Sequence, residues 1–258
     1  MTQRFTIAIG DIHGMSRAIR LLLESLTQRF PAEDTRFVFL GDLIDRGYGS
    51  VRAIDDLCAF FETHPSSVLI LGNHDEYLLR CLQGEMDNSE ARKWLRNGGE
   101  DTLQGYSFYD DFTLKELRKI INGVWPKHLG FLQSAVSMFE TERHCFVHAG
   151  VDPSKTLAEQ DGRTLRWIRE GFLDYEKPFE KIIVHGHTIT ESGFPEVHHN
   201  RIALDSGSYQ TGRISAAIFE DDILIGFMCA TEIERKVTCQ FFDASMNEVT
   251  LEPEITVR

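Results

Sequence analysis

Polar clusters follow six short apolar runs along the chain, and their side chains could form a metal site. The clusters are GDIHG at 10–14, GDLIDRG at 41–47, GNHD at 72–75, HAG at 148–150, HGHT at 185–188 and DSG at 205–207. They combine carboxylates, imidazoles, an asparagine amide and an arginine. Such mixed oxygen and nitrogen ligands suit borderline divalent metals such as Mn, Fe or Zn, and they do not suit an all-oxygen calcium site.

A pair of metal ions about 3.5–4 Å apart needs a carboxylate that bridges them. Asp42 is central in the series of clusters and is the natural bridge. Two such cations would lower the pKa of a shared water molecule toward neutrality. The glycines beside the candidate ligands would allow tight turns and close approach of the backbone.

The elements that must position these clusters alternate between strands and helices. The apolar runs at 5–9, 37–40 and 67–71 predict strands, and amphipathic stretches at 16–30 and 50–61 predict the helices between them. Continuously apolar strands in this order are typical of a parallel sheet that is buried on both faces. Ligands bind outside the carboxyl ends of strands in such sheets, so we expect the clusters to converge there.

The middle of the chain, about 76–135, reads as a helical insertion, with breaks at NGG (97–99) and VWP (124–126). We expect no linker that would free this insertion, and therefore a single domain over residues 1–258. Strands return at 144–147, 181–184 and 201–204, and the last runs predict an antiparallel meander from residue 215 to 242.

The ordered motifs GDxHG, GDxxDRG, GNHD, HAG and GHT resemble the calcineurin-like metallophosphoesterase superfamily. More closely, they resemble the bacterial branch of its phosphoprotein-phosphatase family, which includes symmetrical diadenosine tetraphosphatases. The resemblance runs from residue 10 to about 190. It implies an α/β fold, a four-layer α/β/β/α sandwich in which two mixed sheets lie face to face with helices outside.

The resemblance also implies a role for each matching residue. Asp11 and His13 would bind the first metal, Asp42 would bridge both, and the second metal would be bound by Asn73, His148 and His187. His74 would donate a proton to the leaving group and Asp45 would orient it. The phosphate would be bound by Arg46 and, on a looser match to LRWIRE, by Arg169.

The implied function is a dinuclear metal phosphatase that uses Mn, or Fe or Zn, most consistent with a serine/threonine protein phosphatase. The alternative is a symmetrical bis(5'-nucleosyl)-tetraphosphatase that converts Ap4A to two ADP. Asp75 replaces the glutamate usual in eukaryotic protein phosphatases, and HAG replaces their His-Gly-Gly form, which weakens the inference of a phosphoprotein substrate. A non-catalytic metal-binding scaffold is the remote alternative, because no ligand, acid or arginine of the motifs is lost.

Three aromatic or imidazole residues near the motifs have no assigned role. His185 lies two positions before His187, which places both on the same side of an extended strand. We expect His187 to be the metal ligand and His185 to lie outside the set of ligands. Trp167 is expected in the core, and Tyr209 follows a strand end from which it could reach phosphate.

The net charge, the cysteines and the lack of long apolar stretches limit the partners and the compartment that we expect. The net charge is −13, from 27 basic and 40 acidic residues, which opposes binding to nucleic acid. The five cysteines show no CxxC spacing, so we expect free thiols in a reducing compartment. The sequence shows no secretory signal and no apolar stretch near 18 residues, so we expect a cytoplasmic protein without a membrane partner. The predicted substrate is a phosphoprotein or a phosphorylated small molecule or nucleotide, and the oligomeric state is left open.

Overall fold

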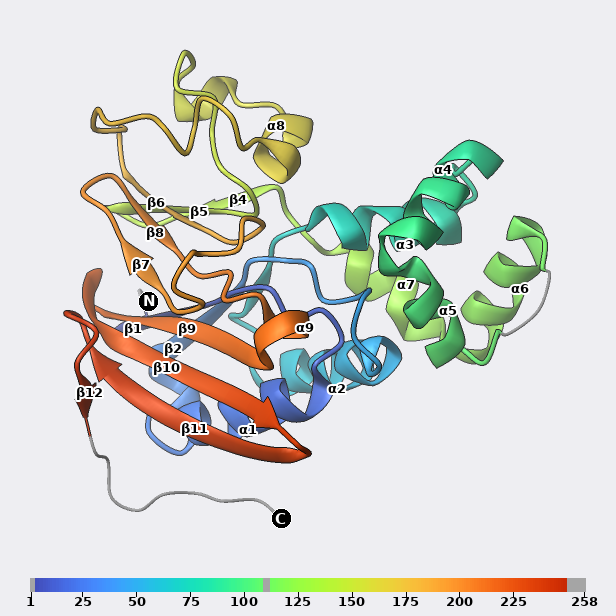
Figure 1. Ribbon diagram of the computed structural model, residues 1–258, viewed down its shortest axis with the longest axis horizontal. Helices are drawn as coiled ribbons and strands as arrows, with labels where there is room; N and C mark the ends of the chain where they lie inside the picture. Colours follow the sequence, from blue (N-terminus) through green and yellow to red (C-terminus); the bar gives the residue numbers. More distant parts are fainter. Residues whose placement is uncertain (1–2, 109–111, 250–258) are drawn as a thin grey trace.

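The computed structural model describes residues 3–108 and 112–249, and these residues form two mixed sheets flanked by helices (Figure 1). The first sheet has the order β12-β11-β10-β9-β1-β2-β3. Its strands are β1 (Phe5–Ile9), β2 (Thr35–Phe39), β3 (Val68–Leu69), β9 (Arg213–Glu220), β10 (Ile223–Ile233), β11 (Lys236–Asp243) and β12 (Glu248–Val249). β1, β2 and β3 are parallel, as predicted, and β9 to β12 form the antiparallel meander.

The second sheet has the order β4-β5-β6-β8-β7, in which β5, β6 and β8 are parallel. Its strands are β4 (Met138–Glu140), β5 (His144–Val147), β6 (Ile182–His185), β7 (Glu196–Val197) and β8 (Arg201–Ala203). The edge strand β4 pairs antiparallel with β5, and the edge strand β7 pairs antiparallel with β8. Neither edge strand was predicted from the sequence. They have two or three residues each, too few to show a periodic pattern.

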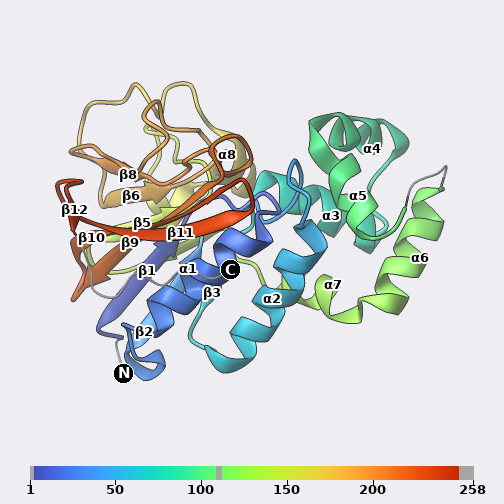
Figure 2. The same cartoon turned by 60° about the horizontal axis from the view of Figure 1, so that its bottom comes forward.

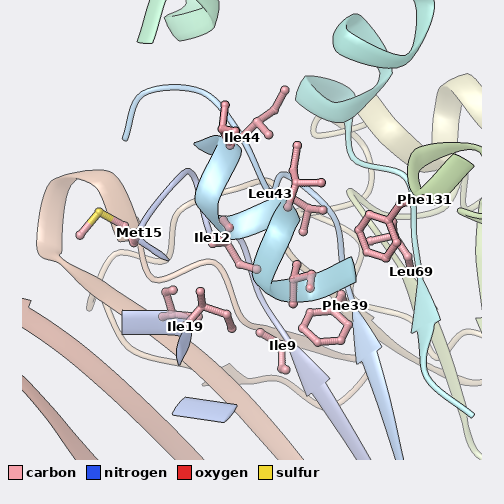
Figure 3. Close-up of a cluster of buried hydrophobic side chains, with 14 of the residues drawn as sticks. Ile9, Ile12, Met15, Ile19, Phe39, Leu43, Ile44, Leu69 and Phe131 are labelled. Atoms are coloured by element: carbon pink, nitrogen blue, oxygen red, sulfur yellow. The ribbon is translucent and has the colours of Figure 1, made fainter. Parts of the chain in front are cut away.

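Side chains that alternate along the strands build the layers. Ala8 of β1 points to the inner layer, while Ile7 and Ile9 point to the helices α1 (Ser16–Thr27) and α2 (Ser50–Thr63). The inner layer joins both sheets through Ala8, Val38, Leu40, Ile70, Phe146, Val184, Ile202, Leu204, Ala217, Phe219, Phe227, Cys229 and Phe242. Figure 2 shows the two sheets stacked with α1 outside the first, and Figure 3 shows Ile9 between Ile19 of α1 and Phe39 of β2.

The outer face of the second sheet is covered by α8 (Gly162–Trp167) and the loops around it. Cys145, Val147 and Ile183 of the sheet pack there against Leu165 and Phe172. The resulting order of helix, sheet, sheet and helix confirms the expected four layers.

A set of helices extends to one side of the sheets, at the right of Figure 1. It comprises α3 (Asn73–Gln83), α4 (Asn88–Trp94), α5 (Glu100–Gly105), α6 (Leu114–Val124) and α7 (Pro126–Gln133). The break at VWP separates α6 from α7. The NGG stretch lies in a π-helical turn, Leu95–Gly99, that kinks at Gly98 between α4 and α5. We call residues 73–133 the helical segment.

No helix in the described part of the chain is both long and apolar enough to cross a membrane.

Candidate metal and catalytic site

The six predicted clusters meet at the carboxyl ends of the parallel strands of both sheets. Each predicted metal ligand follows a strand directly or begins α3, and all are buried: Asp11, His13, Asp42, Asn73, His148 and His187. Several site residues have positive φ, which non-glycine residues rarely adopt: His13 (42°), Asp42 (51°), Asp45 (72°), Arg46 (67°) and His187 (65°). Backbone strain of this kind clusters at functional sites.

The first group of ligand atoms lies around His13. Its Nε2 is 3.9 Å from Oδ2 of Asp11 and 3.7 Å from Oδ2 of Asp42. The ligand atoms of His13, Asp42 and His74 all lie within 4.8 Å of one another. His13 is therefore close to both other predicted ligands of the first metal, whereas the group within 4.8 Å contains His74, predicted as the acid, in place of Asp11.

The second group shares Asp42. Nε2 of His148 is 3.4 Å from Oδ1 of Asp42 and 2.9 Å from Oδ1 of Asn73. The ligand atoms of Asp42, His148 and His187 lie within 4.8 Å of one another. Because Asp42 belongs to both groups, it stands where a bridging carboxylate must stand.

The histidine tautomers fit metal binding. Nδ1–H of His13 donates to the carbonyl of Ile44 and Nδ1–H of His148 donates to the carbonyl of Leu40, both at 2.8 Å. These bonds orient each ring and direct Nε2 into the site, as in protein metal centres. Nε2 of His187 is buried and has no hydrogen-bond partner among the residues that the structure describes. A buried imidazole nitrogen without a partner is costly, and a metal would satisfy it.

Burial and neighbouring charges shift the pKa values of several site residues, toward the metal-binding form in His13, His187 and Asp42 and away from it in Asp11. Burial lowers the pKa of His13 to about 3 and that of His187 to about 2, so both rings are neutral. Burial opposes ionisation of Asp42, but His148 and His74 outweigh it and hold the pKa of Asp42 well below its usual value. Burial and the nearby Asp205 raise the pKa of Asp11. Cations would relieve this crowding of carboxylates.

The two predicted catalytic residues form a dyad. Nδ1–H of His74 donates to Oδ2 of Asp45 at 2.7 Å, which leaves Nε2 as the nitrogen able to face a substrate. The backbone N–H of His74 donates to Oδ1 of Asp42 at 2.9 Å. His74 is thus tied both to the carboxylate that orients it and to the shared metal ligand.

The two predicted phosphate-binding arginines contact residues of different ligand groups. Nη1 of Arg46 donates to Nε2 of His13 at 3.0 Å, and its guanidinium lies 4.7 Å from the ring centre of Tyr209. Nη2 of Arg169 donates to the carbonyl of His187 at 3.2 Å. A phosphate bound by both cations would be stabilised where its negative charge develops, and this role of the two arginines stays a prediction.

Two expectations about neighbouring residues need correction. His185 and His187 do not lie on one side of an extended strand, because β6 ends at His185 and His187 has a φ of 65°. The ring of His185 instead packs against Phe172 at 5.0 Å, away from the two ligand groups. Trp167 is not a core residue. It is half-buried beside His187, and its indole N–H donates to Glu76 at 3.4 Å.

Tyr209 lies at the site, as its position after a strand end allowed. Its ring packs edge-on against His13 at 5.3 Å and under the guanidinium of Arg46. It therefore contacts a predicted ligand and a predicted phosphate-binding residue.

Three residues at the site were given no role from the sequence, although the DSG cluster was expected to converge there. Asp205 is a buried carboxylate from the DSG cluster, and burial raises its pKa to about 6. Its place after a strand was a usable signal. Trp94 and Thr102, from the helical segment, both hydrogen-bond to Asp45. Nothing in their local sequence indicates that contact.

Comparison with known proteins agrees with this geometry. The family described as calcineurin-like phosphoesterase matches residues 6–221. A curated relative from Coxiella burnetii (strain Dugway 5J108-111), named symmetrical bis(5'-nucleosyl)-tetraphosphatase, is 38% identical over 156 residues. That match covers 60% of this chain and 45% of the relative. The match spans less than half the length of such curated relatives.

Solved structures share the fold at low sequence identity. A candidate diadenosine tetraphosphatase superposes with a TM-score of 0.57 at 19% identity, covering 86% of this chain and 92% of that one. A cold-active protein tyrosine phosphatase superposes with a TM-score of 0.55 at 14% identity, covering 95% of this chain and 80% of that one. These likenesses bear on the fold alone.

Proposed function

The chain belongs to the calcineurin-like phosphoesterase family, and on that premise we propose that it hydrolyses dinucleoside tetraphosphates symmetrically. The observation that carries this proposal is the 38% identity over 156 residues with a protein named for that activity. The protein is then a metal-dependent phosphoric ester and anhydride hydrolase. Its substrate would be a small phosphorylated molecule, of which Ap4A is the test case.

The residues of the site fit two divalent cations. Asp11, His13 and Asp42 would hold one, and the second would be held by Asp42 together with Asn73, His148 and His187. When bound, such a pair activates a water molecule and neutralises phosphate charge. Mn, Fe and Zn all suit these donors.

The protein's own side chains would perform the remaining tasks. Arg46 and Arg169 would hold the oxygens of the attacked phosphate, where charge grows during the reaction. His74 would give its Nε2 proton to the departing bridging oxygen, while Asp45 keeps the ring in the right tautomer and stabilises the imidazolium. In Ap4A the water oxygen adds to one of the two middle phosphorus atoms. The central P–O bond breaks, so one water and one Ap4A yield two ADP.

The serine/threonine phosphatase expectation has weaker support. It rests on the motifs alone, which the two activities share. The structural neighbour that acts on phosphotyrosine is only 14% identical, so it bears on the fold and not on the substrate. We therefore place nucleotide hydrolysis first.

A substrate panel on Mn-loaded protein tests the proposal. The panel contains Ap4A, a phosphoserine peptide, a phosphotyrosine peptide and p-nitrophenyl phosphate at equal concentrations, with nucleotides separated by chromatography. We expect ADP as the sole nucleotide product of Ap4A and a kcat/KM for Ap4A at least a hundredfold above that for either peptide. AMP and ATP as products, or faster turnover of a peptide, would overturn the proposal.

A further inference from the structure

The helical segment forms several hydrogen bonds to the loop that carries Asp45, the carboxylate of the dyad. Nε1–H of Trp94 donates to Oδ1 and Oδ2 of Asp45 at 3.1 and 2.9 Å. The hydroxyl of Thr102 donates to Oδ1 of Asp45 at 2.6 Å. In return, the backbone N–H of Asp45 donates to Oγ1 of Thr102 at 3.0 Å. Residues 94–102, which we call the clasp, thus bind the carboxylate that orients His74.

The clasp also holds the next residue of the loop. The backbone N–H of Arg46 donates to the carbonyl of Gly98 at 3.2 Å. Gly98 has a φ of 104°, and a Cβ built there would lie 2.7 Å from both N and Cγ of Arg46. The kink at NGG, which the sequence presents only as a helix break, therefore lies directly against the backbone and side chain of Arg46.

These contacts involve the backbone at Asp45 and Arg46, which is strained, and groups that are excluded from water. Asp45 and Arg46 both have left-handed φ values, which persist only where the surroundings enforce them. Trp94 is 1% exposed, and Thr102 and Asp45 are fully buried. Hydrogen bonds to an ionised acceptor in such a setting are among the strong ones.

The donors around the two carboxylate oxygens of Asp45 fix the orientation of that carboxylate. Oδ1 takes the hydroxyl of Thr102, Oδ2 takes the imidazole of His74, and the indole of Trp94 spans both. A carboxylate held at both oxygens cannot rotate away from His74 without breaking two other bonds. The ring of His74 therefore keeps Nδ1 on Asp45 and Nε2 free.

We propose that Trp94 and Thr102 are positioning residues for proton donation, which act on His74 through Asp45. This inference rests on the proposed function only in that His74 must donate a proton to a leaving group. A merely structural role, in which the same bonds anchor the helical segment, is the competing explanation. The two differ in what removal of one bond does to turnover in a folded protein.

Matched variants separate the two explanations. Trp94→Phe keeps the ring and removes the donor, Thr102→Val keeps the shape and removes the hydroxyl, and Thr102→Ser restores a hydroxyl. Trp125→Phe is the control, because Trp125 is a half-buried tryptophan in the same segment that packs on Tyr106. Each protein is loaded with Mn and tested on Ap4A, with metal content and melting temperature measured beside kcat and KM.

We expect Trp94→Phe and Thr102→Val to lower kcat about tenfold each, equivalent to ~1.4 kcal/mol, with KM and metal content close to wild type. Thr102→Ser should recover most of the loss, and Trp125→Phe should match the wild type. Wild-type kcat in both donor-deleted variants, with only a lower melting temperature, would overturn the inference.

A second readout does not depend on turnover. Nδ1–H of His74, bonded to a carboxylate at 2.7 Å, should give a downfield proton resonance that disappears in His74→Asn. We expect Trp94→Phe and Thr102→Val to shift or broaden that resonance and Trp125→Phe to leave it in place. An unshifted resonance in both donor-deleted variants overturns the inference. If the wild type hydrolyses no substrate of the panel, the proposed function fails while this resonance still tests the positioning.

Discussion

The strand-end loops and the helical segment are built by opposite rules. In the loops, functional residues such as His13, Asp42 and Asp45 have positive φ, and buried carboxylates crowd together. In the helical segment, capping boxes start α4 at Asp87 and α6 at Thr113, as local preference dictates. The loops keep conformations that cost about 1–3 kcal/mol per residue, and only surrounding structure can hold them.

The comparison teaches that the locally regular region supplies part of that support. Trp94 and Thr102 offer uncharged donors to Asp45, so they hold the carboxylate without adding a charge beside the metal ligands. Apart from Asn73 and His74 at its first turn, the helical segment supports a site whose groups come from the strand-end loops, and the two regions meet at the loop of Asp45.

The largest expected effect is that metal removal alters the strand-end loops and leaves the helices α6 and α7 unchanged. Removing divalent ions with a chelator should abolish hydrolysis and speed amide hydrogen exchange at 11–13, 42–46 and 185–188. Exchange in α6 and α7 should stay unchanged, because no predicted ligand lies in them. Binding at a hundred times Kd stabilises by ~2.7 kcal/mol, so the melting temperature should fall too. Equal acceleration in both regions would remove the distinction.

The next effect concerns the dyad. His74→Asn should lower kcat by about 10²–10⁴-fold, because proton donation to the leaving oxygen is lost. Metal content should stay at the wild-type level, since the bonds between His148, Asn73 and Asp42 do not involve the ring of His74. The exposed His199→Asn is the control. Unchanged turnover in His74→Asn would refute its assignment as the acid.

A smaller effect tests the point where the two regions touch. Gly98→Ala should lower the free energy of unfolding by more than about 1 kcal/mol and raise KM, because the new Cβ meets Arg46 and the φ of 104° is strained for alanine. In Gly123→Ala, in α6, the new Cβ meets no atom of the described residues within 4 Å, so the change should stabilise by ~0.5–1 kcal/mol. Urea unfolding and steady-state kinetics check both. A wild-type KM in a folded Gly98→Ala protein would show that Arg46 does not depend on this contact.

The smallest effect is a pH dependence within the helical segment. Nε2–H of the buried His128 donates to Asp55 at 2.9 Å, and Nδ1 accepts from the hydroxyl of Tyr106 at 2.6 Å. Burial lowers the pKa of His128 below its ordinary 6.5. Below pH 6.5 this histidine therefore binds a proton more readily in the unfolded chain than in the folded protein. The free energy of unfolding falls as the pH drops from 6.5 toward the pKa of His128 in the folded protein.

The size of this effect is limited to ~1.4 kcal/mol per pH unit for one histidine. We expect the loss of unfolding free energy between pH 7.5 and 5.5 to be smaller in His128→Gln than in the wild type. Urea unfolding at the two pH values measures the difference. An equal loss in both proteins would show that His128 does not contribute.

Much of the site could be predicted from short stretches of sequence. Each cluster follows an apolar run that is itself recognisable, and parallel strands present their carboxyl ends at one edge. Asp11, His13, Asp42 and His148 therefore meet where the sequence placed them. The continuously apolar run of β1 likewise predicts a sheet covered on both faces, and Ile7 and Ala8 pack into the clusters on its two sides.

Other features could not be predicted, because they depend on contacts between distant segments. The strands β4, β7 and β12 are too short for a periodic signal and exist through their partners. The turn at His187 was mistaken for extended strand, since only the surrounding structure holds its φ of 65°. The contacts of Trp94 and Thr102 with Asp45 join positions 49 and 57 residues apart.

The sequence by itself determined the set of chemical groups and the strand ends that carry them, because both follow from local composition and periodicity. Only the tertiary structure decided how Asp45 is held, which neighbours crowd Asp11, and that the NGG kink rests on Arg46. Those features arise from packing between segments, and packing is not a property of any one segment.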